Sequence, residues 1–330
     1  MPNAYSIRVQ GVVQGVGFRP FIYRLARAHD LKGWVVNAED GVRIRIEGDA
    51  SSTRSFLDEV RTAAPQAACI SEIVVEPADL ADFREFTIHE SAGHRKPTVR
   101  ISPDLPVCAK CLQELFDPQD RRYLYPYVNC TDCGPRYSVI RSLPYDRPNT
   151  TMAAWELDSF CAAEYGDPAN RRFHAQPVAC SACGPRYVFR SGGETVSRDH
   201  ESIQRAAHDL QAGKILAVKG LGGYHLACDA KNADAVSALR ARKFRKEKPF
   251  ALMVKTIDVA RRVIDLAPET ADLLTSVARP IVLARATIDL PGVSPENDEL
   301  GVMLPYTPLH HLLFAAGAPE ILVMTSANRS

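Results

Sequence analysis

Residues 130–137 read CTDCGPRY, and fifty positions later residues 180–187 read CSACGPRY. The first copy closes a longer unit, because CAKC at 108–111 precedes CTDC at 130–133 by a gap of eighteen residues. Two such pairs of cysteines are typical of a site in which two knuckles offer four thiolates to one zinc ion. The sequence therefore predicts a zinc site with the following ligands: Cys108, Cys111, Cys130 and Cys133.

The second copy repeats this unit with one change of ligand type. DSFC at 158–161 and CSAC at 180–183 have the same gap, and DPANRRF aligns with the DPQDRRY of the first copy. The unit is therefore duplicated. A second zinc site would use Cys161, Cys180 and Cys183. Its fourth ligand could be the Asp158 carboxylate or the ring of His174, or the site could be weakened or empty.

Zinc is expected to have a structural role in these segments. Segments this short bury little apolar surface, and zinc binding supplies on the order of 10 kcal/mol in small finger peptides. The alternative is RNA binding by arginines that lie near aromatic residues. We expect these arginines to pack and pair within the fingers instead. They are Arg121, Arg122, Arg136, Arg171, Arg172 and Arg186.

Composition limits the class of protein. The chain has 330 residues, 46% of them hydrophobic and 24% charged, which is enough for several buried cores. Its net charge of +1 gives no overall attraction to nucleic acid. No apolar run reaches the roughly 18 residues that span a bilayer, and the first residues lack the core of a signal peptide, so a cytoplasmic protein is expected. The repeated spacings of the cysteines favour metal binding over a disulfide framework.

The N-terminal stretch GVVQGVGFRPF, residues 11–21, predicts a strand, a glycine loop and a helix. A loop of this kind presents backbone N–H groups at a helix N-terminus, which favours an anion. Arg19 adds a charged fork suited to phosphate. The sequence predicts a phosphate cradle, with a tight turn of no further function as the alternative. Its loop residues are Gln14, Gly15, Val16, Gly17 and Phe18.

The residues that follow predict the β-α-β-β-α-β order of a ferredoxin-like sandwich, about ninety residues long. Strands are expected around 35–37, 42–46 and 73–75, and a second helix is expected over 56–64. The cradle, together with GWVVNAEDG at 33–41, resembles the signature of the acylphosphatase family. The resemblance implies that Arg19 holds an acyl phosphate and that Asn37 orients the attacking water.

The C-terminal third predicts an α/β domain. Ser202 is expected to cap a helix that carries Ile203 and Leu210, and Asn232 is expected to open another helix. Buried strands are expected at the apolar runs 215–219, 250–254, 280–284 and 321–325.

Polar residues after these strands are candidates for a nucleotide site. The candidates are Lys219, Lys243, Arg245, Ser326 and Asn328. Lysine and arginine suit phosphates, whereas serine and asparagine can hydrogen-bond a nucleotide. The alternative is a solvated basic helix end followed by an ordinary turn.

Polar stretches at 91–106 and 190–199 predict boundaries. We expect an α+β multidomain chain with three parts: a ferredoxin-like, acylphosphatase-like α/β sandwich over 1–91, a linker and a pair of zinc fingers over 92–198, and an α/β nucleotide-binding domain over 199–330. The last part resembles the YrdC-like domains.

The order of these parts resembles the HypF family, the carbamoyltransferases of [NiFe]-hydrogenase maturation. Motifs of the middle region carry the resemblance, among them NCTDCGPRYS, LPYDRPNTTM and RRFHAQP. It implies an enzyme that hydrolyses carbamoyl phosphate to carbamate and uses ATP, with magnesium, to form carbamoyl adenylate. It also implies HypE as the acceptor protein and structural zinc in the fingers.

The family's C-terminal transferase domain has no counterpart in these residues. Because the sequence stops directly after an apparent strand, we expect a truncated YrdC-like domain and no final transfer step. Two other functions are weighed: a threonylcarbamoyl-adenylate synthase of tRNA modification, and a zinc-dependent RNA-binding module.

Overall fold

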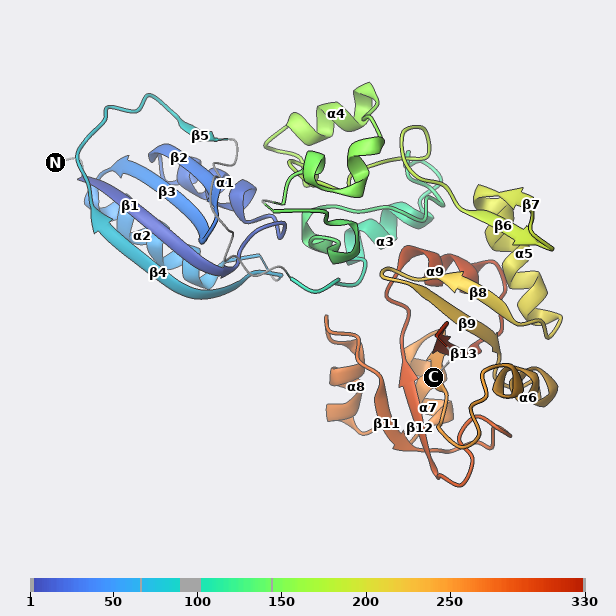
Figure 1. The fold of residues 1–330 in the computed structure, drawn as a ribbon. Coiled ribbons are helices and arrows are strands. Elements are labelled where there is room, and N and C mark those ends of the chain that lie inside the picture. The colour runs from blue at the N-terminus through green and yellow to red at the C-terminus, as the bar shows by residue number, and fades with distance from the viewer. Residues whose placement is uncertain (1–2, 66, 90–101, 144, 329–330) are drawn as a thin grey trace. The chain divides into compact units, whose positions relative to one another are not determined.

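The computed structural model describes residues 3–65, 67–89, 102–143 and 145–328 (Figure 1). The chain forms two compact units, one of residues 1–111 with 128–184, the other of residues 112–127 with 185–330. Most of the linker expected at 91–106 lies outside the described residues. The domain bounds given above stay predictions.

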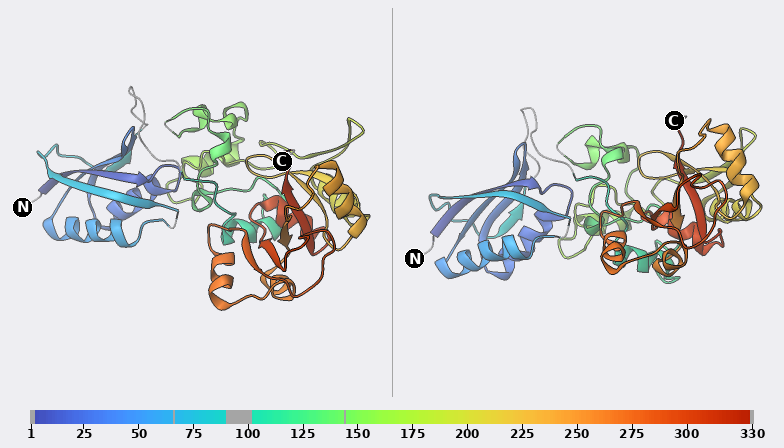
Figure 2. Two further views of the ribbon diagram at one scale, coloured as in Figure 1. Left: turned by 60° about the horizontal axis from the view of Figure 1, so that its bottom comes forward. Right: turned by 90° about the horizontal axis from the view of Figure 1, so that it is seen from below.

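The first unit begins with a five-stranded sheet in the order β4-β1-β3-β2-β5. All neighbours are antiparallel except β2 and β5, which are parallel. Two helices complete the predicted ferredoxin-like sandwich, which is confirmed (Figures 1 and 2). Its elements are β1 (Asn3–Val12), α1 (Phe18–Ala28), β2 (Lys32–Ala38), β3 (Gly41–Gly48), α2 (Ala50–Thr62), β4 (Cys69–Pro77) and β5 (Phe86–Ile88).

Alternation in the sequence explains this sheet. In β1 the side chains of Ile7 and Val9 are buried, and that of Arg8 between them is exposed, as the period of two requires. Phe18 and Ile22 of α1 and Phe56 of α2 pack into the same core. The α1 helix thereby fixes the position of the loop that precedes it.

The finger region contains little regular structure. Two helices of eight residues each are joined by turns and by short 3-10 segments. The elements are α3 (Ala109–Phe116), η1 (Thr131–Cys133), η2 (Tyr137–Val139), η3 (Arg147–Asn149), η4 (Thr151–Ala154) and α4 (Ser159–Gly166). Cysteines are among the fully buried side chains of both knuckles: Cys111, Cys130, Cys161 and Cys180.

The second unit contains a six-stranded mixed sheet in the order β11-β12-β10-β13-β9-β8. A separate two-stranded sheet consists of β6 and β7. The elements of the unit are β6 (Val188–Ser191), β7 (Glu194–Arg198), α5 (Asp199–Gln211), β8 (Leu216–Lys219), β9 (Tyr224–Asp229), α6 (Ala233–Arg242), β10 (Ala251–Val254), α7 (Ile257–Val263), α8 (Pro268–Thr275), β11 (Val282–Arg285), β12 (Glu299–Met303), α9 (Pro308–Ala315) and β13 (Ile321–Ser326). Apolar side chains of α6, α7 and α8 share one core with the strands. The expected α/β domain is confirmed.

The structure corrects several local expectations. Ser202 does not cap a helix, because α5 begins at Asp199 and Ser202 is buried within it. The polar stretch 190–199 is not an irregular linker, because it forms most of the β6-β7 hairpin and the start of α5. The second helix ends at Thr62, two residues before the expected end.

No helix among the described residues is both long and apolar enough to cross a membrane.

The N-cap of α6 can be tested by substitution of Asn232. Its Oδ1 accepts a hydrogen bond of 2.9 Å from the N–H of Ala235 and caps α6, as predicted. Asn232→Ala should destabilise α6 by about 1 kcal/mol, whereas Asn232→Ser should keep most of the stability. Hydrogen–deuterium exchange of the α6 amides should then be about fivefold faster in the alanine variant. Equal exchange in both variants would contradict this role for the cap.

Candidate active site and metal clusters

The loop between β1 and α1 has the backbone geometry of an anion cradle. Gly15 and Gly17 have φ values of 73° and 75°, a left-handed conformation that glycine adopts without steric cost. Gly17 is the N-cap of α1, and no side chain caps this helix. The amides of Phe18 and Arg19 at its first turn are therefore available to an anion, which the helix dipole also favours.

The side chains of the other loop residues hold the cradle in place. Gln14 Nε2 donates to the carbonyls of Ala38 and Gly41, at 2.7 and 2.8 Å, and so ties the loop to the β2-β3 turn. Val16 and Phe18 are buried in the sandwich core. Among the five predicted loop residues, these three can meet a ligand chiefly through their backbone.

Arg19 and Asn37 lie at the same pocket, from α1 and β2 respectively. Asn37 is 1% exposed, and neither its Oδ1 nor its Nδ2 has a hydrogen-bond partner among the described residues. Buried amide groups without partners are costly. The Arg19 side chain is 7% exposed, and its Nη2 donates to Asp146 Oδ1 at 3.2 Å. Asp146 comes from the finger region, which therefore takes part in the site.

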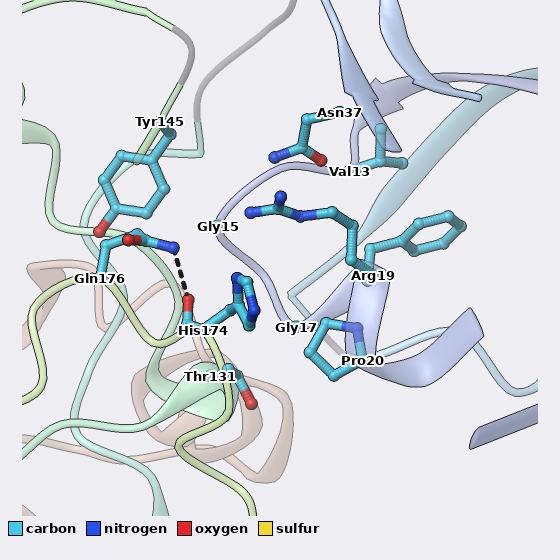
Figure 3. Close-up of a pocket in the computed structure, with 11 residues that line it drawn as sticks. Val13, Gly15, Gly17, Arg19, Pro20, Asn37, Thr131, Tyr145, His174 and Gln176 are labelled. Atoms are coloured by element: carbon cyan, nitrogen blue, oxygen red, sulfur yellow. Dashed lines mark hydrogen bonds between the residues drawn. The ribbon is translucent and has the colours of Figure 1, made fainter. Parts of the chain in front are cut away.

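The pocket is small and is formed by both parts of the first unit (Figure 3). Its volume of about 20 Å³ admits a group of the size of a water molecule or little more. The sandwich contributes Val13, Gly15, Gly17, Phe18, Arg19, Pro20 and Asn37. The finger region contributes Thr131, Tyr145, His174 and Gln176.

His174 belongs to this pocket and not to a metal cluster. It was one of two candidates for the fourth zinc ligand, but its ring stacks on Tyr165, with 5.1 Å between centroids. Burial, with a further contribution from the charge of Arg19, lowers the pKa of His174 to about 4. His174 is therefore a neutral imidazole at neutral pH.

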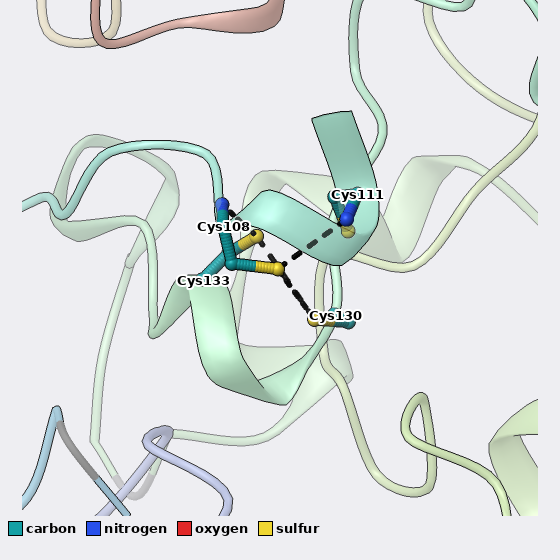
Figure 4. Close-up of side chains that lie close together, drawn as sticks. All are labelled: Cys108, Cys111, Cys130 and Cys133. Atoms are coloured by element: carbon teal, nitrogen blue, oxygen red, sulfur yellow. Dashed lines mark hydrogen bonds between the residues drawn. The ribbon is translucent and has the colours of Figure 1, made fainter. Parts of the chain in front are cut away.

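Cys108, Cys111, Cys130 and Cys133 form the first metal cluster (Figure 4). Their sulfur atoms all lie within 4.8 Å of one another, with 3.6 Å between those of Cys108 and Cys130. Contact with the Cys111 thiol lowers the pKa of Cys108 to about 6, and the same contact raises the pKa of Cys111. Four thiols this close cannot all ionise without a cation between them, so the donor set fits a tetrahedral zinc ion.

The second cluster is completed by Asp158. Its ligand atoms, with those of Cys161, Cys180 and Cys183, also lie within 4.8 Å of one another. One carboxylate oxygen, Oδ1, accepts from the N–H of Cys161 at 2.8 Å and caps α4. The other, Oδ2, lies 3.2 Å from the sulfur of Cys180. Asp158 therefore presents a carboxylate oxygen to the cluster, and three thiolates with one carboxylate also suit zinc.

Residue Arg171 of the second finger contacts the cysteine ligands of the first finger. Its Nη1 lies 3.2 Å from the sulfur of Cys111 and 3.9 Å from that of Cys108. Its carbonyl accepts from the N–H and the hydroxyl of Thr131, at 3.2 and 3.0 Å. The second finger thus places a positively charged side chain beside the cysteine ligands of the first finger.

The arginines of the fingers pack mainly inside the protein. Arg122, Arg136 and Arg172 are at most 7% exposed. Arg136 donates to the carbonyls of Leu105 and Cys133, both at 2.9 Å. Internal packing therefore holds for these three of the six arginines, whereas Arg121 and Arg186 are exposed.

Four of the five candidate nucleotide residues come together at the end of β13. Lys243 is 3% exposed, and its Nζ donates to the carbonyls of Ser326 and Asn328, at 2.8 and 2.5 Å. Arg245 Nη1 donates to Thr325 Oγ1 at 3.2 Å. The Ser326 hydroxyl donates to Asn328 Oδ1.

Lys219 lies two strands away from this group, at the end of the edge strand β8. Its Nζ donates to the carbonyl of Leu221 at 3.0 Å, and it lies 5.8 Å from the ring centroid of Tyr224. Tyr224 pairs with it across β8 and β9, and the Tyr224 carbonyl accepts from Ala327. All five candidates therefore lie along one end of three neighbouring strands.

The finger residues of the pocket were not predicted as part of the phosphate site, and His174 was considered only as a zinc ligand. The duplication carried a signal for two of them. Shifted by fifty positions, His174 aligns with Leu124 and Gln176 aligns with Pro126. Both His174 and Leu124 have φ values near 55°. The backbone conformation at this position is thus the same in both copies, whereas the side chain differs.

Three protein families match successive parts of the chain. Residues 5–88 match the acylphosphatase family, residues 107–140 and 159–189 match the HypF finger, and residues 208–330 match the family described as telomere recombination, named for Sua5, YciO and YrdC. The acylphosphatase of Thermotoga maritima is 45% identical over 87 residues, which are 96% of that protein and 26% of this chain. The chain belongs to the acylphosphatase family through this segment.

Nearly the whole chain is similar to part of a family of longer proteins. Carbamoyltransferase HypF of Rhodobacter capsulatus is 50% identical over 329 residues, which are 99% of this chain and 43% of that protein. A crystal structure of full-length HypF in the phosphate- and nucleotide-bound form superposes with a TM-score of 0.91, at 41% identity, over 100% of this chain and 43% of that one. The chain is a homologue of the HypF carbamoyltransferases over its whole length and spans less than half of theirs.

The second metal cluster can be tested through Asp158. Asp158→Asn keeps an oxygen for the cap of α4 but replaces the oxygen that faces the cluster, so zinc affinity at this site should fall by at least about tenfold. Titration with a chromogenic chelator should then release one of two zinc ions at low chelator concentration. The matched control is Asp132→Asn, a carboxylate between Cys130 and Cys133 that does not belong to the first cluster. Unchanged zinc retention in Asp158→Asn would show that Asp158 is not a ligand.

Proposed function

We propose that the first unit hydrolyses carbamoyl phosphate to carbamate and phosphate. The observation that carries this proposal is Asn37, a buried side chain without partners among the described residues that lies beside Arg19 at a small pocket. An amide in this state is ready to hold a water molecule. The family names of the relatives, acylphosphatase and carbamoyltransferase, support an acyl phosphate with a carbamoyl group.

The proposed reaction needs only groups of this chain and water. The amides of the loop and the Arg19 guanidinium bind the phosphoryl oxygens and stabilise the charge of the transition state. Asn37 holds the water in line with the bond that breaks. The water oxygen bonds to phosphorus while the bond from phosphorus to the carbamoyl oxygen breaks. Carbamate leaves with the electron pair, and the protons of the water remain on the phosphate.

The Arg19–Asp146 ion pair fits this sequence of events. Without a ligand, the Asp146 carboxylate satisfies the guanidinium and holds it at the pocket. An incoming phosphoryl group offers more oxygen acceptors to the same fork. Arg19 is thus kept in position between turnovers.

The second unit is proposed to convert carbamate and ATP into carbamoyl adenylate and pyrophosphate. A carbamate oxygen attacks the α-phosphorus of ATP, and pyrophosphate leaves, with magnesium as the expected counterion of the nucleotide. Lys219, Lys243, Arg245, Ser326 and Asn328 are the proposed contacts. Their grouping at one end of neighbouring strands supports this, as does the nucleotide-bound form in which full-length HypF has been crystallised.

The wider role proposed is the supply of carbamoyl groups to HypE for the cyanide ligands of [NiFe]-hydrogenase. It comes from the family of the relatives, of which this chain spans 43%. We place the reaction in the cytoplasm, because the clustered cysteines must stay reduced to bind metal.

The hydrolytic step is tested by Arg19→Ala and Asn37→Ala. Loss of one stabilising group should reduce kcat/KM for carbamoyl phosphate by about 10²–10³-fold, measured as released phosphate. Arg24→Ala, an exposed arginine on the same helix, is the matched control and should keep normal activity. Near-normal activity of Arg19→Ala would refute the proposed site.

The adenylating step is tested by Lys243→Met, which removes the charge and keeps the aliphatic chain. Exchange of labelled pyrophosphate into ATP, with carbamoyl phosphate present, should fall by about 10²-fold, while hydrolysis of carbamoyl phosphate stays normal. Lys246→Met, an exposed lysine three residues away, should leave both activities intact. A loss of hydrolysis together with exchange would point to misfolding and would be checked by thermal unfolding; normal exchange would exclude Lys243 from the nucleotide site.

A further inference from the structure

One side of the pocket is formed by residues from outside the sandwich. The sandwich provides Arg19 and Asn37, whereas Tyr145, His174 and Gln176 come from the finger region and face them across the cavity (Figure 3). The Thermotoga maritima acylphosphatase aligns over 96% of its length with the sandwich alone. The finger side of the pocket therefore has no counterpart in that protein.

This side lies where the acyl end of a substrate must go. The phosphoryl end is bound by the loop amides and Arg19, so the acyl group projects away from them toward the finger residues. The two parts are in close contact there. A Cβ atom added to Gly15 would lie 2.6 Å from Cδ1 of Tyr145, and one added to Gly17 would lie 2.9 Å from Cβ of Thr131. The loop glycines thus allow the finger residues to approach the cradle.

The finger side is also held rigidly. Gln176 Oε1 accepts from the N–H of Arg147 at 2.7 Å and from the Tyr165 hydroxyl at 2.8 Å, and its Nε2 donates to the carbonyl of His174 at 2.8 Å. The His174 ring lies between Tyr165 and Phe173, with centroid distances of 5.1 and 4.4 Å. Moving these side chains aside would break several contacts at once.

We propose that Tyr145, His174 and Gln176, named here the acyl wall, restrict the site to acyl phosphates whose acyl group is as small as carbamoyl or acetyl. The close approach of the acyl wall to the cradle supports this limit, because a Cβ atom added to Gly15 would already lie 2.6 Å from Cδ1 of Tyr145 and little space is left between the two sides. An aromatic acyl group does not fit unless the acyl wall moves. The proposal rests on the proposed function for the position of the phosphoryl group.

His174 is the residue of the acyl wall best suited to a test. Its φ of 54° is a left-handed conformation, which asparagine adopts more readily than most other residues. His174→Asn therefore removes the ring while keeping the backbone. The Gln176 side chain keeps its partner, since it bonds to the backbone carbonyl at 174.

The experiment compares kcat/KM for acetyl phosphate and benzoyl phosphate in the full chain. The wild type should prefer acetyl phosphate by at least about tenfold, and His174→Asn should raise the ratio of benzoyl to acetyl phosphate hydrolysis by about tenfold, since a group that does not fit costs binding in the transition state. Tyr137→Ala, an exposed tyrosine of the finger region, is the control and should leave the ratio unchanged.

Equal hydrolysis of both substrates by the wild type would overturn the acyl wall whether or not any variant folds. An unchanged ratio in His174→Asn, with normal zinc content and thermal unfolding, would overturn the role of His174. If acetyl phosphate is hydrolysed with the expected size limit and carbamoyl phosphate is not, the acyl wall stands and the carbamoyl assignment fails. Failure to hydrolyse any of these acyl phosphates would overturn both.

Discussion

Crowding of ionisable thiols is the constraint on which the first unit depends. Each cluster brings four ligand atoms within 4.8 Å of one another in a region that has only short helices and turns. Without a cation such a group is electrostatically unfavourable, and with one it becomes a cross-link. The turns that carry Tyr145, Asp146 and His174 have no sheet of their own to hold them. Side-chain contacts hold them beside the cradle: Arg19 pairs with Asp146, the Tyr145 hydroxyl accepts from the N–H of Arg136, and Gln176 bonds to the carbonyl of His174.

The pocket is formed by two parts of the first unit that are stabilised in different ways. The cradle is formed by backbone atoms of a sandwich with a large apolar core, and Gln14 fixes it to the β2-β3 turn. The opposite side is formed by side chains of the fingers. Arg19 stands at the boundary, since its backbone belongs to α1 and its guanidinium is paired with Asp146. A pocket made in this way combines a backbone loop of the acylphosphatase-like sandwich with side chains of the finger region.

The sequence predicted the elements with strong periodicity and missed those without it. Alternation identified β1 and β3, because each buries one face, and the cysteine spacing identified both clusters. The three-residue strand β5 has no pattern of its own and forms by pairing with β2. The strands β9 and β12 were also missed, although each pairs both with the strand before it and with a strand more distant in the chain.

The same limit applies to the site. Arg19, Asn37 and the loop could be found from one local motif. Asp146 lies 127 positions from Arg19, and no local pattern relates them. His174 was considered only as a metal ligand, since a histidine near cysteines suggests one. Its place in the pocket follows from a difference between the two copies of the repeat, which becomes informative once the packing is known.

The contact of Arg171 with the sulfur atoms of Cys108 and Cys111 has a consequence for how the protein responds to its surroundings. The guanidinium of Arg171, which belongs to the second finger, compensates the negative charge of the thiolates in the first finger. Metal binding at one site should therefore favour an ordered structure at the other site. A shortage of the ion would loosen both knuckles together and leave the sandwich folded. Supply of the trace element would then affect both the position of Arg19, whose guanidinium pairs with Asp146 of the finger region, and the side chains that face it across the pocket.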